Sequence, residues 1–546
     1  MGFMARSRRA TRVRLLSVLV AAALVAVACG DDDDGGGGTA TPTSGGGTSA
    51  STSATGGGED DAEADPNGVV RIVQSVSAAN TTFDPTTTNS GLNTMLFSLY
   101  GTLLTKRSLT EYEPNLATRV EVIDPQTIEV ELREGLVFSD DTPVDAEALK
   151  FNLERFRDNP NRLGLRSEFM AGLDHVEVTG PLSATVHLKT PTSGIFYDLF
   201  AGPETILISP TAIRNGVNLR EEAVGAGPFV LESWQPDVRM VVKKNPKYWN
   251  ADAVKVAGIE FIQLTIGPPV INGLRAGDVD MANIDANLAR SLAPPITSES
   301  FPHPGPFILN VCKRDEPLSD VRVRQALAHA MDRDALIQGM YGGQSEPVWS
   351  LQREGDPRYD ESLEGIYDHD IDKAKQLLAE AGYPDGFDTS MIVSAGGVSL
   401  TAGELLQGQW REIGVDVSIT PTPNVVQDFY LDGKAPMFPI TQTRAGIDAY
   451  SVLLLPGSFA AVCGYDDPVV GQAVRDVMAL PQDSPEGIEA WQKLSRLVQE
   501  TLPFIPMVFH NQVVAWNTDR IGGLEWQLDE FGNSIPILDR IFVKAS

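Results

Sequence analysis

From residue 69 onward, apolar and polar residues follow each other in short runs that switch between strand spacing and helical spacing. Alternation with a period of two predicts strands, and apolar residues three or four positions apart predict one face of a helix. We expect strands or extended segments beginning at 69 and 127, a hairpin at 175–191, two strands within 225–250, and further strands at 256–266, 278–284, 389–395, 415–421, 502–517 and 538–546. Helices are predicted to end near 104 and to lie at 145–158, 270–276, 320–340, 370–382 and 401–414.

The ends of several predicted helices carry their own signals. Asp145 and Asp320 precede helical runs and are typical N-caps. Gly277, Gly382 and Pro384 follow such runs and favour their termination. The strand, helix and strand between 389 and 421 predict an α/β unit.

Residues 69–546 are too many for one compact core, so two or more lobes are expected. Before them, five arginines between 6 and 14 precede a 14-residue apolar run, 15–28, which is typical of a secretory signal and too short to span a bilayer. Cys29 follows this run directly, and residues 30–68 are almost entirely Gly, Ser, Thr, Ala, Asp and Glu, a composition that predicts a disordered tether. The simpler alternative is a cleaved secretory peptide with an incidental cysteine.

The formal net charge is −30, and about −26 remains without the signal and the tether. Such an acidic chain is not expected to bind nucleic acid, whose phosphates need a basic surface. The other two cysteines, Cys312 and Cys463, form an even pair in an exported chain, which leaves open a disulfide or two buried thiols.

Enzyme signatures are absent from the sequence. The phosphate-binding loop G-x-x-x-x-G-K-[ST], H-E-x-x-H, C-x-x-C and G-x-S-x-G do not occur, and none of the six histidines forms an i, i+4 pair. "GAGPF" at 225–229 opens no predicted helix, so we expect no phosphate cradle there. No enzymatic activity, metal or cofactor is therefore expected.

Eleven segments in order resemble one family, the extracellular substrate-binding proteins of peptide/nickel-type ABC importers. They include "FDP" (83–85), "LYGTLLT" (99–105), "LREGLVFSDDTPVDAEALKFNLER" (132–155), "GAGPFVLESW" (225–234), "KKNPKYW" (243–249), "DVRVRQALAHAMDRDALI" (320–337), "AKQLLAEAGYPDGF" (374–387) and "LPFIPMVFHNQVVAW" (502–516). Together the segments cover nearly all of residues 69–546. The N-terminal segment, in which Ala28 precedes Cys29, resembles a bacterial lipoprotein signal, and this resemblance implies that the cysteine is diacylated and becomes the mature N-terminus. Two acyl chains give stable anchoring at about 0.8 kcal/mol per buried methylene.

The resemblance implies an α/β fold with two lobes, a clam-shell of the class II periplasmic-binding-protein type, with an extra subdomain in the first lobe. The implied boundaries are a lipoprotein signal at 1–29, the tether at 30–68, lobe I at 69–305 with an inserted subdomain at about 106–222, lobe II at 306–508, and a return to lobe I at 509–546. The chain is then expected to cross the hinge near 305 and again near 508.

Ligand contacts are expected where cleft-lining segments of the family match. In peptide-binding relatives, the segment matching "TQTRAGIDAYSVLLL" (441–455) carries an aspartate that pairs with the peptide's α-ammonium group. Gly446 falls at that position here and Arg444 replaces a tryptophan, which favours an anionic or chelate-like solute as an alternative to a peptide. The residues expected to contact the ligand are Arg444, Asp448, Tyr450, Trp349, Phe83 and Tyr100, whereas Tyr248 and Trp249 are expected in the core.

The function implied is a receptor, tethered to the outer face of the bacterial cytoplasmic membrane, that captures a peptide or other small polar solute for an ABC permease. A monomer without cofactor or nucleic acid is expected. The alternative from another class is a signalling or adhesion module that uses the same fold to bind a protein. An exported hydrolase is a third possibility, but it would need a nucleophile and base that the sequence does not offer.

Overall fold

The computed structural model describes residues 63–74, 82–87, 93–108, 111–160, 170–264, 267–314, 316–395, 397–442, 446–458, 460–461, 465–481, 484–529 and 532–545. All of them belong to one compact unit, Gly57–Ser546. The other unit, Met1–Gly56, contains the predicted signal, Cys29 and most of the predicted tether, and lies outside the described residues.

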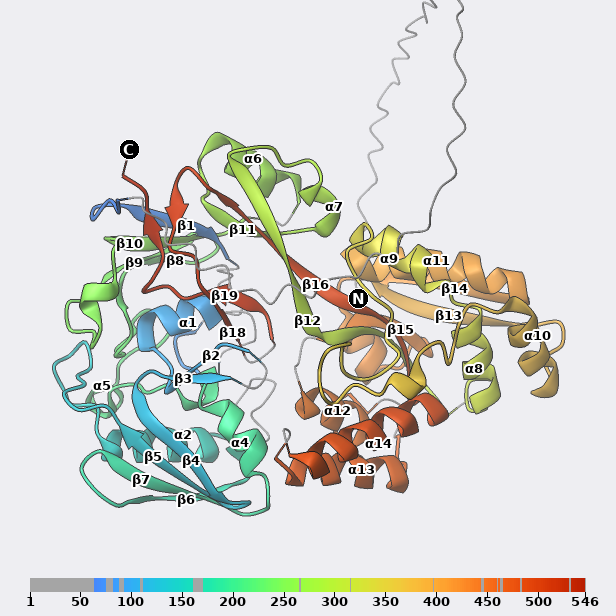
Figure 1. Cartoon of the computed structure of the whole chain (residues 1–546), viewed down its shortest axis with the longest axis horizontal. Coiled ribbons are helices and arrows are strands. Elements are labelled where there is room, and N and C mark those ends of the chain that lie inside the picture. The colour runs from blue at the N-terminus through green and yellow to red at the C-terminus, as the bar shows by residue number, and fades with distance from the viewer. Residues whose placement is uncertain are drawn as a thin grey trace, which may run out of the picture. The chain divides into compact units, whose positions relative to one another are not determined.

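A mixed ten-stranded sheet organises the described chain, in the order β14-β13-β15-β12-β16-β11-β1-β10-β9-β8 (Figure 1). Its strands are β1 (Val69–Val73), β8 (Phe229–Gln235), β9 (Arg239–Lys244), β10 (Gly258–Ile262), β11 (Met281–Ile284), β12 (Ile296–Val311), β13 (Phe387–Ser394), β14 (Val415–Thr422), β15 (Met437–Thr441) and β16 (Phe504–Asn517). Strand β1 pairs in parallel with β10 and β11, and β13 pairs in parallel with β14 around a crossover helix. The α/β unit predicted at 389–421 is therefore confirmed.

Two long strands, β12 and β16, join the two halves of this sheet. We call β8, β9, β10, β1 and β11 with their helices the first half, and β15, β13 and β14 with theirs the second half. Strand β16 pairs with β11 through residues 513–516, and β12 pairs with β15 through residues 307–311. Between these contacts β12 and β16 run side by side and antiparallel (Figure 1). Their register shifts between Pro302 and Pro306.

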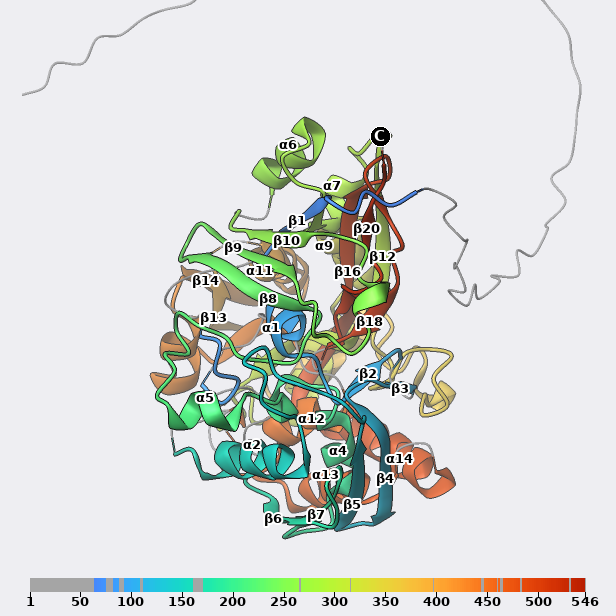
Figure 2. The ribbon, with the colours of Figure 1, turned by 90° about the vertical axis from the view of Figure 1, so that its left-hand side faces the viewer.

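A separate antiparallel sheet lies within the segment predicted as an inserted subdomain. Its order is β4-β5-β7-β6, with β4 (Ala117–Asp124), β5 (Thr127–Leu132), β6 (Leu173–Val178) and β7 (Ser183–Leu188). Helix α2 (Ala146–Asp158) packs on β6 and β7 (Figure 2). The predicted N-cap is confirmed, because the Asp145 carboxylate accepts a hydrogen bond from the Ala148 backbone N–H at 2.8 Å.

Shorter elements complete the fold. The small two-stranded sheets are formed by β2 (Leu104–Lys106) with β3 (Tyr112–Pro114), β17 (Ile521–Gly522) with β20 (Phe542–Val543), and β18 (Trp526–Leu528) with β19 (Ser534–Pro536). Besides α2, the α-helices described before residue 300 are α1 (Asn93–Tyr100), α4 (Ser193–Leu199), α5 (Pro210–Arg214), α6 (Pro268–Ala276) and α7 (Ala286–Ala289). Gly277 ends α6 in a left-handed conformation, φ 76°, as its position predicts.

The second half is covered by helices, which are α8 (Val321–His329), α9 (Arg333–Tyr341), α10 (Ile371–Glu380), α11 (Gly397–Trp410), α12 (Ile447–Leu454), α13 (Pro468–Ala479) and α14 (Pro485–Thr501). The single helix predicted at 320–340 is wrong, since the chain forms α8 and α9 there. Asp332 starts the second of them by accepting a hydrogen bond from the Ala335 N–H at 2.9 Å. The apolar residues keep a helical spacing through both helices, which is why the sequence predicts one helix, but the chain turns at Asp332.

The folded chain starts slightly before the predicted tether boundary at 68. The Asp65 N–H donates to the Val543 carbonyl at 2.8 Å, and the Ala545 N–H donates to the Glu63 carbonyl at 2.7 Å. This backbone pairing needs no apolar side chain, so the hydrophobic pattern gives no sign of it.

Candidate functional site

A cavity of about 370 Å³ opens beside β16, one of the two strands that join the halves. The ends of β1 and β11, the start of α1, the middle of β16 and the segment from β18 to β19 surround it. Its polar lining consists of Gln74, Asn93, Thr94, Asn283, Asp285, His510, Asn511, Gln512, Asp529, Asn533 and Ser534. The described lining contains no lysine or arginine. Amides and hydroxyls that both donate and accept hydrogen bonds are the groups with which pockets orient small polar ligands.

Hydrogen bonds between distant segments shape this cavity. The Asn93 amide on α1 donates to the Asp529 carboxylate at 3.1 Å, and the Asn533 N–H donates to the same side chain at 2.8 Å. On β16, the Gln512 amide donates to Asn283 at 2.8 Å and accepts from the Ser534 N–H at 2.7 Å. Residues 526–529 and 532–536 are thereby held against both α1 and β16.

His510 reaches the cavity from the point where β16 passes between the halves. Its ring lies 5.2 Å from that of His303, and its Nδ1 is buried with no hydrogen-bond partner among the described residues. Burial and the nearby Arg353 guanidinium lower the pKa of His510 to about 4. At neutral pH the cavity is therefore lined by an uncharged imidazole, in which one ring nitrogen donates and the other accepts a hydrogen bond.

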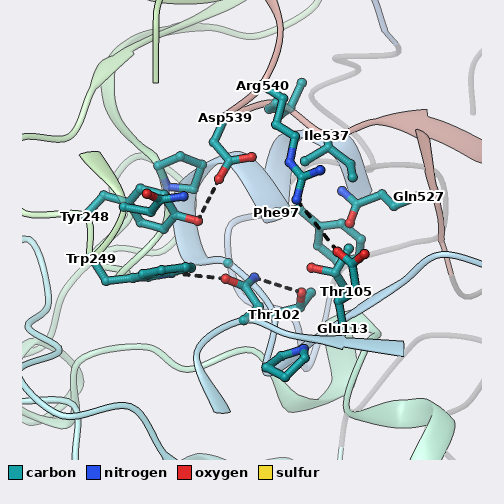
Figure 3. Close-up of a pocket in the computed structure, with 16 residues that line it drawn as sticks. Phe97, Thr102, Thr105, Glu113, Tyr248, Trp249, Gln527, Ile537, Asp539 and Arg540 are labelled. Atoms are coloured by element: carbon teal, nitrogen blue, oxygen red, sulfur yellow. Dashed lines mark hydrogen bonds and ion pairs between the residues drawn. The ribbon is translucent and has the colours of Figure 1, made fainter. Parts of the chain in front are cut away.

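A second, smaller cavity of about 100 Å³ lies in the first half, between α1, β3 and residues 537–540 (Figure 3). The Tyr248 hydroxyl donates to the Asp539 carboxylate at 3.2 Å, and burial raises the pKa of Asp539. Trp249 is 37% exposed, so its predicted place in the core is wrong. Its indole instead stacks 3.8 Å from the Arg133 guanidinium and donates to Asn115. This space holds only a few water molecules, so of these two cavities the one of about 370 Å³ is the candidate site.

The described residues show two further features that bear on function. No group of three or more His, Cys, Asp or Glu side chains among them is placed to hold a metal ion. No helix in the same ranges combines the length and apolar composition needed to cross a bilayer.

The family model of bacterial extracellular solute-binding proteins, family 5 Middle, matches residues 111–458. The chain belongs to this family. Glutathione-binding protein GsiB of Salmonella paratyphi A is 30% identical over 358 residues, which are 64% of this chain and 69% of that protein. The structure of AgaA from A. tumefaciens R10, in complex with agropinic acid, matches with a TM-score of 0.73 and 21% identity over 88% of this chain and 99% of that chain. The structure of DppA from Helicobacter pylori, in complex with the peptide STSA, matches with a TM-score of 0.73 and 20% identity. The match covers 88% of this chain and 98% of that chain.

The family match and the similar solved structures confirm the predicted fold class, a two-lobed α/β binding protein. The family match and the relatives also confirm the predicted function class, an extracytoplasmic solute-binding receptor of an ABC transporter. The family consists of receptors and not of enzymes.

The structure brings two of the predicted ligand contacts of the binding protein together in the first half. The Tyr100 hydroxyl donates to the Phe83 carbonyl at 2.7 Å, and both side chains are almost fully buried, at 0% and 1% exposure. The Phe83 ring meets the edge of Trp234 at 5.8 Å. "GAGPF" packs against the same helix end, because a Cβ on Gly227 would lie 2.6 Å from the Leu99 carbonyl carbon.

Two other predicted contacts lie in the second half. Tyr450 is 2% exposed, packs on Trp491 and Phe504, and donates its hydroxyl to the Leu351 carbonyl at 3.0 Å. Trp349 lies 4.8 Å from the Arg333 guanidinium, and its carbonyl accepts from the Gln499 amide. None of these aromatic residues is among the lining of the 370 Å³ cavity.

Most of the other predicted residues lie outside the described ranges. Arg444 and the side chain of Asp448 lie outside the described residues, as do Cys29 and Cys463. Gly446, at the position of the family's aspartate, has φ 73° and precedes α12. Cys312 is disulfide-bonded.

Sequence reasoning missed the polar residues that line the cavity. "HNQ" at 510–512 interrupts an otherwise apolar strand, and this interruption is the signal that marks it. Asn93, Asp529 and Asn533 carry no such signal, since each belongs to a polar stretch of sequence.

Proposed function

We propose that the protein captures a small polar solute, either a peptide or another compound rich in hydrogen-bonding groups, and delivers it to an ABC permease. The observation that carries this proposal is the 370 Å³ cavity beside β16, whose polar lining is mostly uncharged. Closure removes the solute's polar groups from water, so each needs a partner, and the amides of this lining supply such partners. Among the similar proteins, GsiB is named for glutathione. AgaA was solved with agropinic acid, and DppA was solved with a peptide.

The six residues predicted from the family remain part of the proposal. Arg444 and Asp448 would contact the solute from the second half, and Tyr450, Trp349, Phe83 and Tyr100 would support the walls of the cleft. The contacts of these four aromatic residues favour a supporting role, since three of them are at most 2% exposed. Arg444 would bring a fork of donors suited to a carboxylate.

The further proposal is that a lipid on Cys29 anchors the protein, as a monomer, to the outer face of the cytoplasmic membrane. Its support is the apolar run that ends at Cys29. In detergent phase separation, the full chain should enter the detergent-rich phase, and Cys29→Ser should move it to the aqueous phase. Equal partitioning of both proteins would argue for the cleaved-peptide alternative.

We also propose that Cys463 is the partner of Cys312. Cys312 is bonded in the structure, and the sequence contains only two other cysteines, Cys29 and Cys463. Non-reducing peptide mapping should recover one cross-linked peptide that contains both residues. Two separate thiol-bearing peptides would contradict the pairing.

The deciding experiment is native mass spectrometry of the full chain, purified in detergent from its own host, compared with the denatured protein. Several adducts spaced by amino-acid residue masses would establish a peptide receptor. One discrete non-peptide adduct that disappears in Arg444→Ala would establish the anionic or chelate-like solute. A protein without any adduct would overturn the proposed capture of a small solute and favour a protein-binding module.

A further inference from the structure

The pairing of β12 with β16 is interrupted between the two halves of the sheet. Pro302 lies opposite Asn511, and the next pair is Pro306 opposite Phe509. Three residues of β12, 303–305, thus face the single residue His510. We call this interruption the crossing break.

The Arg353 side chain fills the crossing break with hydrogen bonds. Its Nε donates to the His303 carbonyl at 3.1 Å, on β12. Its Nη2 donates to the His510 carbonyl at 2.7 Å and to the Asn511 side chain at 2.8 Å, on β16. One guanidinium therefore contacts both joining strands at the residues where strand pairing fails.

Arg353 follows a segment of the second half, since Leu351 packs in one apolar cluster with Tyr450 and Trp491. Its Nη1 pairs with the Glu346 carboxylate at 2.5 Å, and the guanidinium lies 4.3 Å from the Phe509 ring. The segment around Glu346 pairs with β16 as well, because the Phe509 N–H donates to the Glu346 carbonyl at 2.8 Å. The side chain is only 16% exposed, so these contacts are weakly screened by solvent.

These contacts have a mechanical consequence. His303 and His510 have no paired residue in the register of β12 and β16, and backbone carbonyls away from water need donors. The planar, multiply donating guanidinium supplies those donors in a fixed geometry, which a lysine ammonium on a flexible stem does not reproduce. Hinges are short segments that absorb backbone changes when two parts move, so a rigid group at this break restricts that motion.

We propose that Arg353 is a positioning residue that clamps the crossing break and limits the range of arrangements that the two halves adopt without solute. The inference rests on the proposed function, since a restricted range lowers the ordering cost of solute capture. Removal of the side chain takes away the hydrogen bonds that it makes to both joining strands at the break, where their regular pairs are missing.

Distance measurements between spin labels test the clamp in the full-length chain without any solute. The labels go on Val238→Cys in the first half and Leu431→Cys in the second, where the native side chains are 53% and 62% exposed. Arg353→Ala should broaden the distance distribution at least twofold, and Arg353→Lys should broaden it less. An unchanged width in Arg353→Ala overturns the proposal.

Arg358→Ala is the matched control. Arg358 is also a mostly buried arginine, pairs with Asp356 at 2.6 Å and lies 5.5 Å from the Trp491 ring, but all these residues belong to the second half. Arg358→Ala should lower stability without changing the width of the distance distribution. Equal broadening in Arg358→Ala and Arg353→Ala overturns the proposal. If Arg353→Ala does not fold, Glu346→Gln weakens the same clamp, and an unaltered width there overturns it too. Because no solute is present, an absent adduct in mass spectrometry would reject the proposed function without affecting this result.

Discussion

At the scale of single residues, close approach between segments that are distant in the sequence sets what each position tolerates. Gly227 lies against the end of α1, where an added Cβ would be 2.7 Å from the Ser98 carbonyl oxygen and 2.7 Å from the Tyr100 nitrogen. Both contacts are with backbone atoms, which cannot turn away as a side chain can. "GAGPF" therefore serves packing in this fold.

Gly227→Ala should lower the free energy of unfolding by about 1–3 kcal/mol, because the backbone has to shift to admit the methyl group. Gly408→Ala is the control, since Gly408 lies in α11 with nothing near its Cβ position. There alanine should stabilise the helix by about 0.5 kcal/mol. Urea unfolding of both variants measures the difference, and equal effects would contradict the packing argument.

His510 makes stability depend on pH at the same scale. Its pKa is about 4 in the folded protein and about 6.5 in an unfolded chain. As the pH falls from about 6.5 to 4, the unfolded state binds a proton that the folded state does not, so stability is lost over this window. Above it the contribution is fully present.

His510→Gln removes this titration, so the variant should lose less stability than the native protein between pH 6.5 and 4. Urea unfolding at several pH values in that window gives the two slopes. Parallel slopes would show that His510 does not titrate as its burial implies.

At the scale of elements, local signals set where helices and strands begin, and tertiary contacts set how they combine. Asp145 and Asp332 both cap helices, at 2.8 Å and 2.9 Å. Only the first cap follows a clear change of pattern in the sequence. Asp332 lies inside an apolar spacing that continues through α8 and α9, so the turn between those helices is visible only in three dimensions.

Asp332→Ala should cost about 1 kcal/mol of stability, because the Ala335 N–H at the start of α9 loses its acceptor. Asp332→Asn keeps an acceptor oxygen at the same place and should retain most of the stability. Thermal and urea unfolding compare the two. A similar loss in both variants would mean that the cap is not what Asp332 contributes.

At the scale of the whole molecule, a solute that binds the folded protein also stabilises it. The gain depends on the ratio of free solute to its Kd and reaches about 2.7 kcal/mol at roughly 100 times Kd. The cavity lies at the junction of elements from residues 72–94, 281–285 and 510–536. Solute contacts there would hold together segments that lie far apart along the chain.

Protein purified from its own host should therefore melt at a higher temperature than the same protein stripped of solute by unfolding, dialysis and refolding. The melting temperature should recover when a small-molecule extract of the host is added back. Circular dichroism before melting controls for incomplete refolding. Identical melting curves, for a protein that mass spectrometry shows to lose its adduct, would contradict a stabilising solute.

Most of the elements and the fold class follow from the sequence. The hairpin at 175–191, the α/β unit at 389–421 and the cap at Asp145 are encoded by neighbouring residues, because helix and strand periodicity and capping act over a few positions. Eleven family segments in order were enough to predict two lobes. The apolar run before Cys29 is also a local feature, and it is the basis for the predicted location outside the cytoplasmic membrane.

The cavity and the crossing break were decided by the tertiary structure alone. Asn93 and Asp529 are 436 positions apart, and Arg353 and His510 are 157 positions apart. Nothing in the local pattern of any of these residues specifies its partner. Their polar groups meet because the folded chain brings these distant segments together, and buried polar groups need partners at whatever distance along the chain they lie.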